Sequence, residues 1–320
     1  MCINILCDLC VFAFKNQPLR FIIFSGYNIR MTHFNPPSRV VLAHHPTMPE
    51  AVPLANQVRA WLTAHGVEVS CFGSLNDPSL AECVRAGGKD LLIVFGGDGT
   101  MLRAGHLTAP LGMPVLGINL GRFGFLFELQ PEDWQDSLPR LLTGDYRLEQ
   151  RMTLLAEHFR GDAKLGAWTV VNEVAVCRGG TVRPVRLRAE VDGYPLASYV
   201  ADGLIAATPT GSTAYALAVG GPILPPELRN ILVIPIAPHL SVDRGIVLAE
   251  GSSVDITVYA DHAAVLSVDG HLPVDMANGD RVHVSAGADV VRFVRFHGPS
   301  AFYRGLMKYM EQNPSAGDAT

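Results

Sequence analysis

The sequence predicts an α/β domain built on a parallel sheet, followed by an all-β domain. Three observations support this prediction. Strand and helix patterns alternate over the first 127 residues, whereas short β-type runs separated by turns dominate afterwards. The composition, with 48% hydrophobic and 17% charged residues in 320, is typical of a compact globular chain long enough for two domains.

The first half alternates apolar runs with amphipathic segments. In the segment 49–64, for example, Ala51, Leu54, Val58 and Leu62 recur at helical spacing. We expect strands at 39–43, 67–71, 91–95 and 113–118, and helices at 49–64, 79–86 and 100–107. Such alternation predicts a parallel sheet with helices on its faces and a ligand site at the carboxyl ends of its strands.

The second half of the sequence has a different pattern, with short β-type runs in place of alternating strands and helices. One helix is expected at 133–142, and Asp-Gly or Asn-Gly turns then separate many short apolar runs. We expect strands at 169–177, 185–191, 204–207, 231–236, 254–259, 264–268 and 282–284, and a last helix at 300–310. The resulting division is a dispensable extension at 1–30, an α/β domain at 31–127, a β-rich domain at 128–296 and a flexible tail at 311–320.

Composition also narrows the class of protein. With 25 basic and 30 acidic residues the net charge is −5 and no long Lys/Arg block occurs, which disfavours nucleic acid as a partner. The apolar stretch 1–30 is interrupted by charges, so it predicts neither a membrane span nor a secretory signal. Cys7 and Cys10 form a lone C-x-x-C, and Cys71, Cys83 and Cys177 are expected as core side chains of a cytoplasmic protein.

The run Gly96-Gly97-Asp98-Gly99-Thr100 directly follows the apolar strand at 91–95. Glycines allow close approach of the backbone to a ligand and leave successive N–H groups available to a phosphate. A carboxylate in such a turn would repel phosphate, so we expect Asp98 to accept a proton from an attacking hydroxyl. The pattern therefore indicates phosphoryl transfer, with Asp98 as a mere turn residue as the alternative.

A second run, 208–215, places four hydroxyl side chains and a tyrosine around Gly211. Ser212 or Thr213 is a plausible N-cap for a short helix through Leu217. Hydroxyls and free N–H groups at a helix start suit nucleotide oxygens. A Ser/Thr-rich turn without a ligand is the alternative reading.

Together these motifs resemble the NAD kinase family. The supporting stretches, in order, are Gly96–Thr100, Gly117–Asn119, Gly124–Leu126, Asn172–Glu173, Asp202–Gly203, Thr208–Tyr215, Gly220–Ile223, Pro235–His239 and Ser267–Gly270. The resemblance covers about 39–296. It departs at Val200, where the family usually has a basic residue, and at His271, where Gln is more common.

The resemblance implies an NAD kinase/diacylglycerol kinase-like fold, in which the helix at about 297–310 packs back on the first domain. It implies ATP-dependent phosphorylation of the 2′-hydroxyl on the adenosine ribose of NAD, giving NADP, with Asp98 as the catalytic base. A divalent metal, magnesium, would arrive with ATP, and no separate protein-built metal site is expected. The implied substrate-binding residues are Gly96, Gly97, Gly99, Thr100, Arg103, Asn172, Glu173, Arg183, Asp202, Thr210, Ser212, Thr213, Ala214, Tyr215, Ala216, Leu217, Ala218 and His271.

The resemblance further implies a cytoplasmic homo-oligomer, a dimer or a tetramer, with NAD and ATP as substrates and neither nucleic acid nor membrane as a partner. Two alternatives remain. A lipid kinase shares the glycine-aspartate motif but would need an apolar cleft, and a non-catalytic nucleotide sensor would not need Asp98. The chain has neither a P-loop nor a G-x-G-x-x-G dinucleotide fingerprint.

Overall fold

The computed structural model describes residues 34–121, 124–180, 182–239 and 243–311. The chain divides into a unit Met1–Met31 and a unit Thr32–Thr320, and every helix and strand below belongs to the second. The expected extension at 1–30 and nearly all of the expected tail at 311–320 lie outside the described residues.

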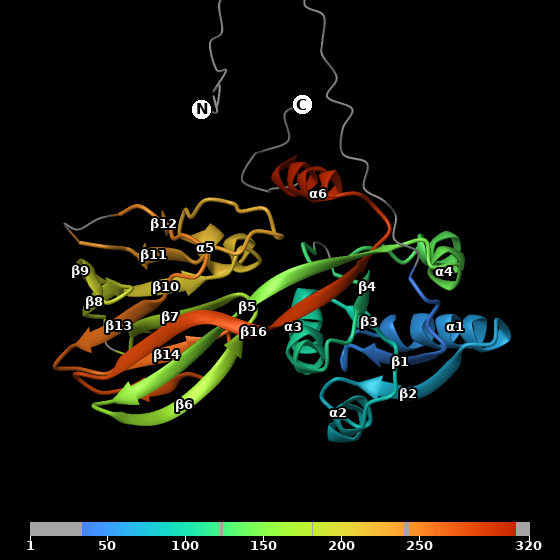
Figure 1. Ribbon diagram of the computed structural model, residues 1–320, viewed down its shortest axis with the longest axis horizontal. Coiled ribbons are helices and arrows are strands. Elements are labelled where there is room, and N and C mark those ends of the chain that lie inside the picture. The colour runs from blue at the N-terminus through green and yellow to red at the C-terminus, as the bar shows by residue number, and fades with distance from the viewer. Residues whose placement is uncertain (1–33, 122–123, 181, 240–242, 312–320) are drawn as a thin grey trace, which may run out of the picture. The chain divides into compact units, whose positions relative to one another are not determined.

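The α/β half is a parallel sheet between two helical layers (Figure 1). Its strands follow the order β2-β1-β3-β4. They are β1 (Arg39–His44), β2 (Glu68–Ser74), β3 (Leu91–Gly96) and β4 (Val115–Asn119). The helices α1 (Ala51–Ala64) and α4 (Trp134–Leu142) cover one face of the sheet, and α2 (Pro78–Arg85) and α3 (Asp98–Thr108) cover the other.

Local sequence explains these elements. All six residues of β3 are buried, as expected for a central parallel strand that is apolar on both faces. The helix α2 begins at Pro78 because Asp77 accepts a hydrogen bond from Ser79 N and proline fits the first helical position. Because β3 and β4 run parallel, Asp98 and Asn119 come together at their carboxyl ends.

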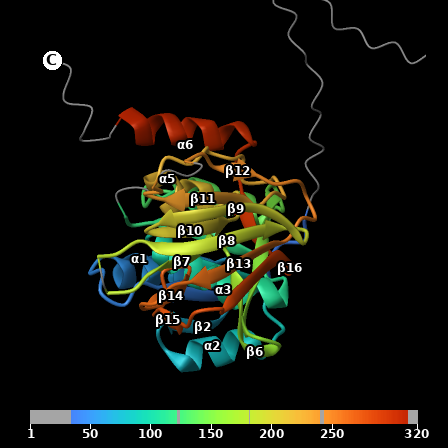
Figure 2. The same ribbon diagram turned by 90° about the vertical axis from the view of Figure 1, so that its left-hand side faces the viewer.

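The β-rich half is a sandwich of two sheets around one apolar core, and its strands face the viewer in Figure 2. The six-stranded sheet has the order β12-β11-β10-β7-β14-β15. It contains β7 (Glu173–Arg178), β10 (Gly203–Ala207), β11 (Leu232–Ile236), β12 (Ile246–Val247), β14 (Ala264–Val268) and β15 (Val274–Met276). The facing sheet contains β5 (Arg147–Arg160), β6 (Ala163–Val170), β8 (Val185–Val191), β9 (Tyr194–Ala201), β13 (Val254–Tyr259) and β16 (Arg281–Arg295).

Two long strands, β5 and β16, continue from the sandwich into the α/β half (Figure 1). The first part of β16 pairs with β13, whereas Phe293 near its end pairs in parallel with Val115 of β4. The parallel sheet and one sheet of the sandwich therefore form a single ten-stranded sheet. This continuity positions both halves relative to α3.

The expected fold class is confirmed, with differences in detail. The expected strand at 282–284 is the start of the fifteen-residue β16, and the expected strand at 169–177 is interrupted at 171–172. Ser212 and Thr213 are not helix caps, because both lie inside a 3₁₀ turn, Gly211–Thr213, that precedes α5 (Tyr215–Ala218). Cys71 and Cys83 were expected as separate core residues but form a disulfide between β2 and α2.

The last described helix is α6 (Ser300–Glu311). Ala301, Phe302, Arg304 and Gly305 of α6 line a cavity together with Asn119 from β4. None of the helices in the described ranges is long and apolar enough to span a membrane.

Candidate functional site

Asp98 is the first residue of α3 and sits at the carboxyl end of β3. Its half-buried carboxylate accepts two long hydrogen bonds from the loop after β4, from Phe125 N at 3.3 Å and Leu126 N at 3.4 Å. The first helical hydrogen bonds of α3 are donated by Thr100 N and Met101 N to Gly97 O. The N–H groups of Asp98 and Gly99 thus precede the hydrogen-bonded turn and point the positive end of the helix toward this corner.

The surroundings of Asp98 are compatible with the proton-accepting role expected from the sequence. Burial raises the pKa of its carboxyl from the ordinary 3.8, while the hydrogen bonds from Phe125 and Leu126 and the charge of Arg151 oppose that shift. A carboxylate with a raised pKa is a stronger base than an exposed one. Arg151 itself is held by Glu149, so its cation is fixed beside the site.

The glycines of this turn have different roles. A Cβ at Gly96 would lie 2.6 Å from Thr100 Oγ1, so a side chain there would collide with the first turn of α3. A Cβ at Gly99 would meet nothing within 4 Å, and this residue is exposed. Gly96 is therefore required for packing, whereas Gly99 leaves the start of α3 open to a ligand.

The Asn172–Glu173 pair and the hydroxyl-rich run pack directly on each other. Thr208 N donates to Asn172 O at 2.8 Å, and Thr208 Oγ1 donates to Val171 O at 2.6 Å. A Cβ at Gly211 would collide with the carbonyl of Asn172. Two motifs 35 residues apart in the sequence thus form one structural unit, and only glycine fits at 211.

Glu173 is a buried carboxyl at the start of β7. Burial, followed by the charge of Asp269, raises its pKa to about 7, and a hydrogen bond from the backbone of Tyr215 opposes the shift. Glu173 Oε2 has no hydrogen-bond partner among the described residues. Such an oxygen is available to accept a hydrogen bond from a ligand hydroxyl.

Asp269 was not among the expected site residues, yet it organises this unit. Its carboxylate accepts hydrogen bonds from Val171 N at 2.7 Å, Asn172 N at 2.8 Å and Glu173 N at 2.9 Å. His106, near the end of α3, places Nε2 2.8 Å from Asp269 Oδ2. The Asp-Gly dipeptide signalled the turn, but nothing in the sequence signalled these partners.

Asp202 lies near the same unit. It is ion-paired with Arg178 at 2.8 Å, and its charge contributes to raising the pKa of Tyr215, after burial and the neighbouring Cys177. Arg183 is separate, because it lines a hollow with Arg186, Tyr259 and His262 on the β8–β13 side of the sandwich.

Four other expected site residues have contacts within the protein. Arg103 on α3 is exposed and donates to Asn76 Oδ1 at 2.5 Å. Ser212 Oγ donates to Pro209 O and accepts from Leu224 N, and Thr213 Oγ1 donates to Thr210 O. His271 packs its ring edge-on against that of His106. The remaining residues, Ala214, Tyr215, Ala216, Leu217 and Ala218, form α5 and the residue before it.

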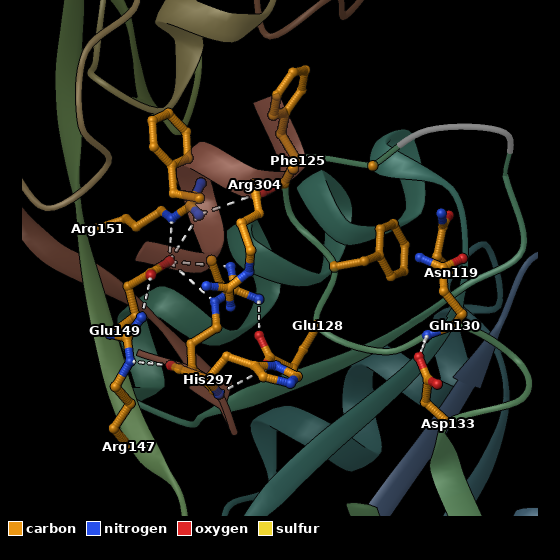
Figure 3. Close-up of a pocket in the computed structure, with 16 residues that line it drawn as sticks. Asn119, Phe125, Glu128, Gln130, Asp133, Arg147, Glu149, Arg151, His297 and Arg304 are labelled. Carbon is orange, nitrogen blue, oxygen red and sulfur yellow. Dashed lines mark hydrogen bonds and ion pairs between the residues drawn. The ribbon is translucent and has the colours of Figure 1, made fainter. Parts of the chain in front are cut away.

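A cavity of about 500 Å³ lies beside the loop that binds Asp98 (Figure 3). Glu149 is central in it and receives Arg147 at 3.1 Å, Arg151 at 2.8 Å and Arg295 at 3.1 Å. Burial opposes ionisation of Glu149, but the guanidinium groups of Arg295 and Arg151 hold its pKa below the ordinary range. Burial lowers the pKa of Arg151 to about 10. Sequence reasoning did not find this cluster, because its members are spread over β5 and β16.

Among the residues that the structure describes, no three His, Cys, Asp or Glu side chains are grouped to hold a metal ion. Oxygen ligands for a divalent cation at Asp98 would have to come largely from the phosphates of a bound nucleotide.

Both halves of the chain match known proteins. The family models of the ATP-NAD kinase N-terminal and C-terminal domains match residues 40–146 and 171–296. An NAD kinase of Heliobacterium modesticaldum is 39% identical over 272 residues, covering 82% of this chain and 95% of its own. An NAD kinase of Polaromonas is 41% identical over 241 residues, covering 75% of this chain and 81% of its own.

Solved structures give the same result. The crystal structure of yeast NADH kinase complexed with NADH has a TM-score of 0.78 at 26% identity, covering 87% of this chain and 89% of its own. An NAD kinase from Archaeoglobus fulgidus in complex with ATP has a TM-score of 0.68 at 26% identity, covering 86% and 100%. The two matched domains span both the Asp98 turn and the Glu173 unit, and the chain belongs to the ATP-NAD kinase family.

Proposed function

We propose that this chain transfers the terminal phosphoryl group of ATP to the 2′-hydroxyl on the adenosine ribose of NAD, producing NADP and ADP. The observation that carries the proposal is the position of Asp98. Its carboxylate stands at the open start of α3, is half-buried, and accepts two long hydrogen bonds from the residues that the structure describes. Capacity to accept another hydrogen bond remains on that carboxylate.

Asp98 acts as the general base. An Oδ atom of Asp98 takes the proton of the 2′-hydroxyl as the hydroxyl oxygen bonds to the terminal phosphorus and the bond to the ADP oxygen breaks. The N–H groups at the start of α3 and the cation of Arg151 lie where negative charge gathers. Magnesium bound to the phosphates of ATP neutralises part of their charge.

Asn172 and Glu173 bind the ribose hydroxyls of NAD. Glu173 Oε2 supports this role because it is buried and has no partner within the described chain. Its neighbours Thr208, Gly211 and Tyr215 hold the pair in place, and the run through Ala218 supplies backbone and ring surface for the nucleosides. Thr210, Ser212 and Thr213 act through this turn, whose hydroxyls are largely used in internal hydrogen bonds.

Four of the expected substrate-binding residues have other surroundings in the structure: Arg103, Asp202, Arg183 and His271. Arg103 can reach a phosphate only by leaving Asn76, and Asp202 is already paired with Arg178. Arg183 lies in its separate hollow, where it would meet a dinucleotide only if another subunit brought one. We propose a homo-oligomer, a dimer or tetramer, in the cytoplasm, by analogy with the family.

We also propose the division into an α/β domain at 31–127 and a β-rich domain at 128–296. The helix α4 packs on the parallel sheet although it lies beyond residue 127, and α6 would complete the α/β domain from the end of the chain. Phe302 and Arg304 of α6 line the cavity beside the loop that binds Asp98, which supports this arrangement.

A coupled assay that measures NADP formation from NAD and ATP tests the function. The assay should show ATP-dependent NADP formation that requires magnesium. Phosphorylation of a diacylglycerol instead would identify a lipid kinase. NAD binding without turnover by the folded protein would identify a nucleotide sensor.

A further inference from the structure

We infer that His106 is a positioning residue that fixes the Asn172–Glu173 turn to the helix carrying Asp98. This inference rests on the proposed function, because it assigns the turn to NAD and Asp98 to catalysis. His106 lies on α3 eight residues after Asp98, and Asp269 contacts both His106 and the turn that carries Asn172 and Glu173. The link therefore joins the two parts of the site through the side chains of His106 and Asp269.

Asp269 is the intermediate of this link. It lies in the turn after β14 and has a left-handed backbone conformation, with φ of 48° followed by Gly270 at 71°. Its fully buried carboxylate receives the N–H groups of Val171, Asn172 and Glu173 within 2.7–2.9 Å. Asp269 N also donates to Glu173 O at 2.9 Å. The turn that presents Asn172 and Glu173 is therefore shaped around one carboxylate.

His106 is the side chain that ties this carboxylate to α3. Its Nε2 lies 2.8 Å from Asp269 Oδ2, an ion-pair distance, although the angles of this contact are not those of a hydrogen bond. Asp269 has no other ion-pair partner in the described chain. The contact is therefore electrostatic, and water screens it little because the carboxylate is buried. The ring of His271 packs edge-on against His106 and limits its rotation.

The contact between His106 and Asp269 matters for catalysis because His106 and Asp98 lie on the same helix, α3. An α-helix rises about 1.5 Å per residue, so Asp98 and His106 are about 12 Å apart along a rigid rod. Next to His106, Gly105 packs against Val291 and then Val171, because a Cβ there would lie 3.4 Å from Val291 Cγ2 and 3.8 Å from Val171 Cγ2. Freeing the turn from α3 would let the ribose-binding pair move relative to Asp98, and a misplacement of about 1 Å can cost a large factor in rate.

The test is His106→Ala, compared with His106→Gln and with the control His65→Ala. Gln can still donate to Asp269, whereas the exposed side chain of His65, at the end of α1, hydrogen-bonds to Trp61 O and stacks on the Trp61 ring. We expect His106→Ala to raise KM for NAD roughly tenfold or more, by loss of a charge-assisted contact, with KM for ATP changed less than about twofold. Hydrogen exchange at the amides of Val171, Asn172 and Glu173 should accelerate. The Gln variant should recover most of both effects, and His65→Ala should resemble the wild type.

Unchanged KM for NAD together with protected amides in His106→Ala would overturn the inference. Equal losses in both KM values with a large fall in Tm would show a general structural role and also contradict it. If the Ala variant does not fold, His106→Gln and His106→Asn provide the same test. Gln is long enough to reach Asp269 and Asn is not, so a wild-type KM for NAD in the Gln variant but not in the Asn variant would support the inference. A wild-type enzyme that forms no NADP would refute the proposed function, whereas the amide exchange would still report whether His106 holds the turn.

Discussion

Two aspartates in this protein lie at the same kind of place, a turn next to a buried strand, but their surroundings differ. Asp98 follows β3 and accepts two hydrogen bonds of 3.3 and 3.4 Å. Asp269 follows β14 and accepts three of 2.7, 2.8 and 2.9 Å, with His106 at 2.8 Å. Asp269 has its acceptor capacity filled, whereas Asp98 keeps capacity for a substrate.

The difference is the one expected between a reacting carboxylate and a structural one. Three short backbone hydrogen bonds use the lone pairs of the Asp269 carboxylate and hold its neighbours in place. A carboxylate with long hydrogen bonds, and a pKa raised by burial, can take up a proton when a hydroxyl approaches. On the proposed function, the same residue type serves chemistry in the α/β half and architecture in the β-rich half.

The largest expected effect is that of Asp98→Asn. Asn can still hydrogen-bond a hydroxyl but cannot accept its proton at neutral pH, so kcat should fall by roughly 10²–10⁴-fold. A largely dissociative transition state favours the lower part of that range. NAD binding and Tm should change little, as measured by calorimetry. Near-normal kcat in a folded variant would make Asp98 a turn residue like any other; the exposed Asp136→Asn serves as the control.

Asp269→Asn should show the opposite profile. The amide cannot accept from three N–H groups as a carboxylate does, so buried donors lose partners and unfolding should become easier by roughly 2–4 kcal/mol. Urea denaturation measures this loss. If Asp269→Asn is as stable as the wild type and loses activity only in kcat, Asp269 is not the structural residue that we infer.

Glu173→Ala tests whether the structural unit serves NAD. Removal of a charge-assisted hydrogen bond to a ribose hydroxyl is worth about 1.5–3 kcal/mol, so KM for NAD should rise roughly tenfold to a hundredfold. KM for ATP should change much less. Equal changes in both constants would place Glu173 away from the acceptor.

Glu173→Gln tests the raised pKa of Glu173 through the pH dependence of the melting temperature. The folded-state pKa of Glu173, about 7, lies above the ordinary 4.5, so ionisation disfavours the folded state. This cost is absent below pH 4.5, develops between pH 4.5 and 7, and is complete above pH 7. The Gln variant should therefore melt higher than the wild type at pH 8 and equally at pH 4. A constant difference across that range would show that Glu173 does not titrate as described.

The smallest effect is expected from a chain that begins at Met31. If the first 30 residues do not contribute to the fold, its Tm and turnover should equal those of the full chain. Differential scanning calorimetry and the coupled assay check this, and a Tm lower by many degrees would show that the segment packs.

Much of the fold could be predicted from sequence, because its signals are local. Apolar runs such as 91–95 predict strands, and Asp-Gly pairs such as Asp192–Gly193 predict turns, from their own residues alone. The length of β16 could not be predicted, since its second part pairs with β5 and β4 rather than following a simple alternation.

Some residues of the candidate site could likewise be predicted from local sequence, and others could not. Asp98, Asn172 and Glu173 stand in motifs that the sequence displays. His106, Arg151 and Asp269 become relevant only through contacts between residues far apart in the chain, such as the 163 positions between His106 and Asp269. No local pattern marks a histidine that meets its partner only after two sheets have joined.

The pH dependence of the single-turnover rate of NADP formation tests the central claim most directly. Asp98 must be ionised to accept a proton, so the rate should fall as pH decreases through a pKa higher than the ordinary 3.8, because burial raises it. The slow residual rate of Asp98→Asn should lack this acid limb. A wild-type rate that stays constant down to pH 4, or an identical acid limb in Asp98→Asn, would contradict the assignment of Asp98 as the base.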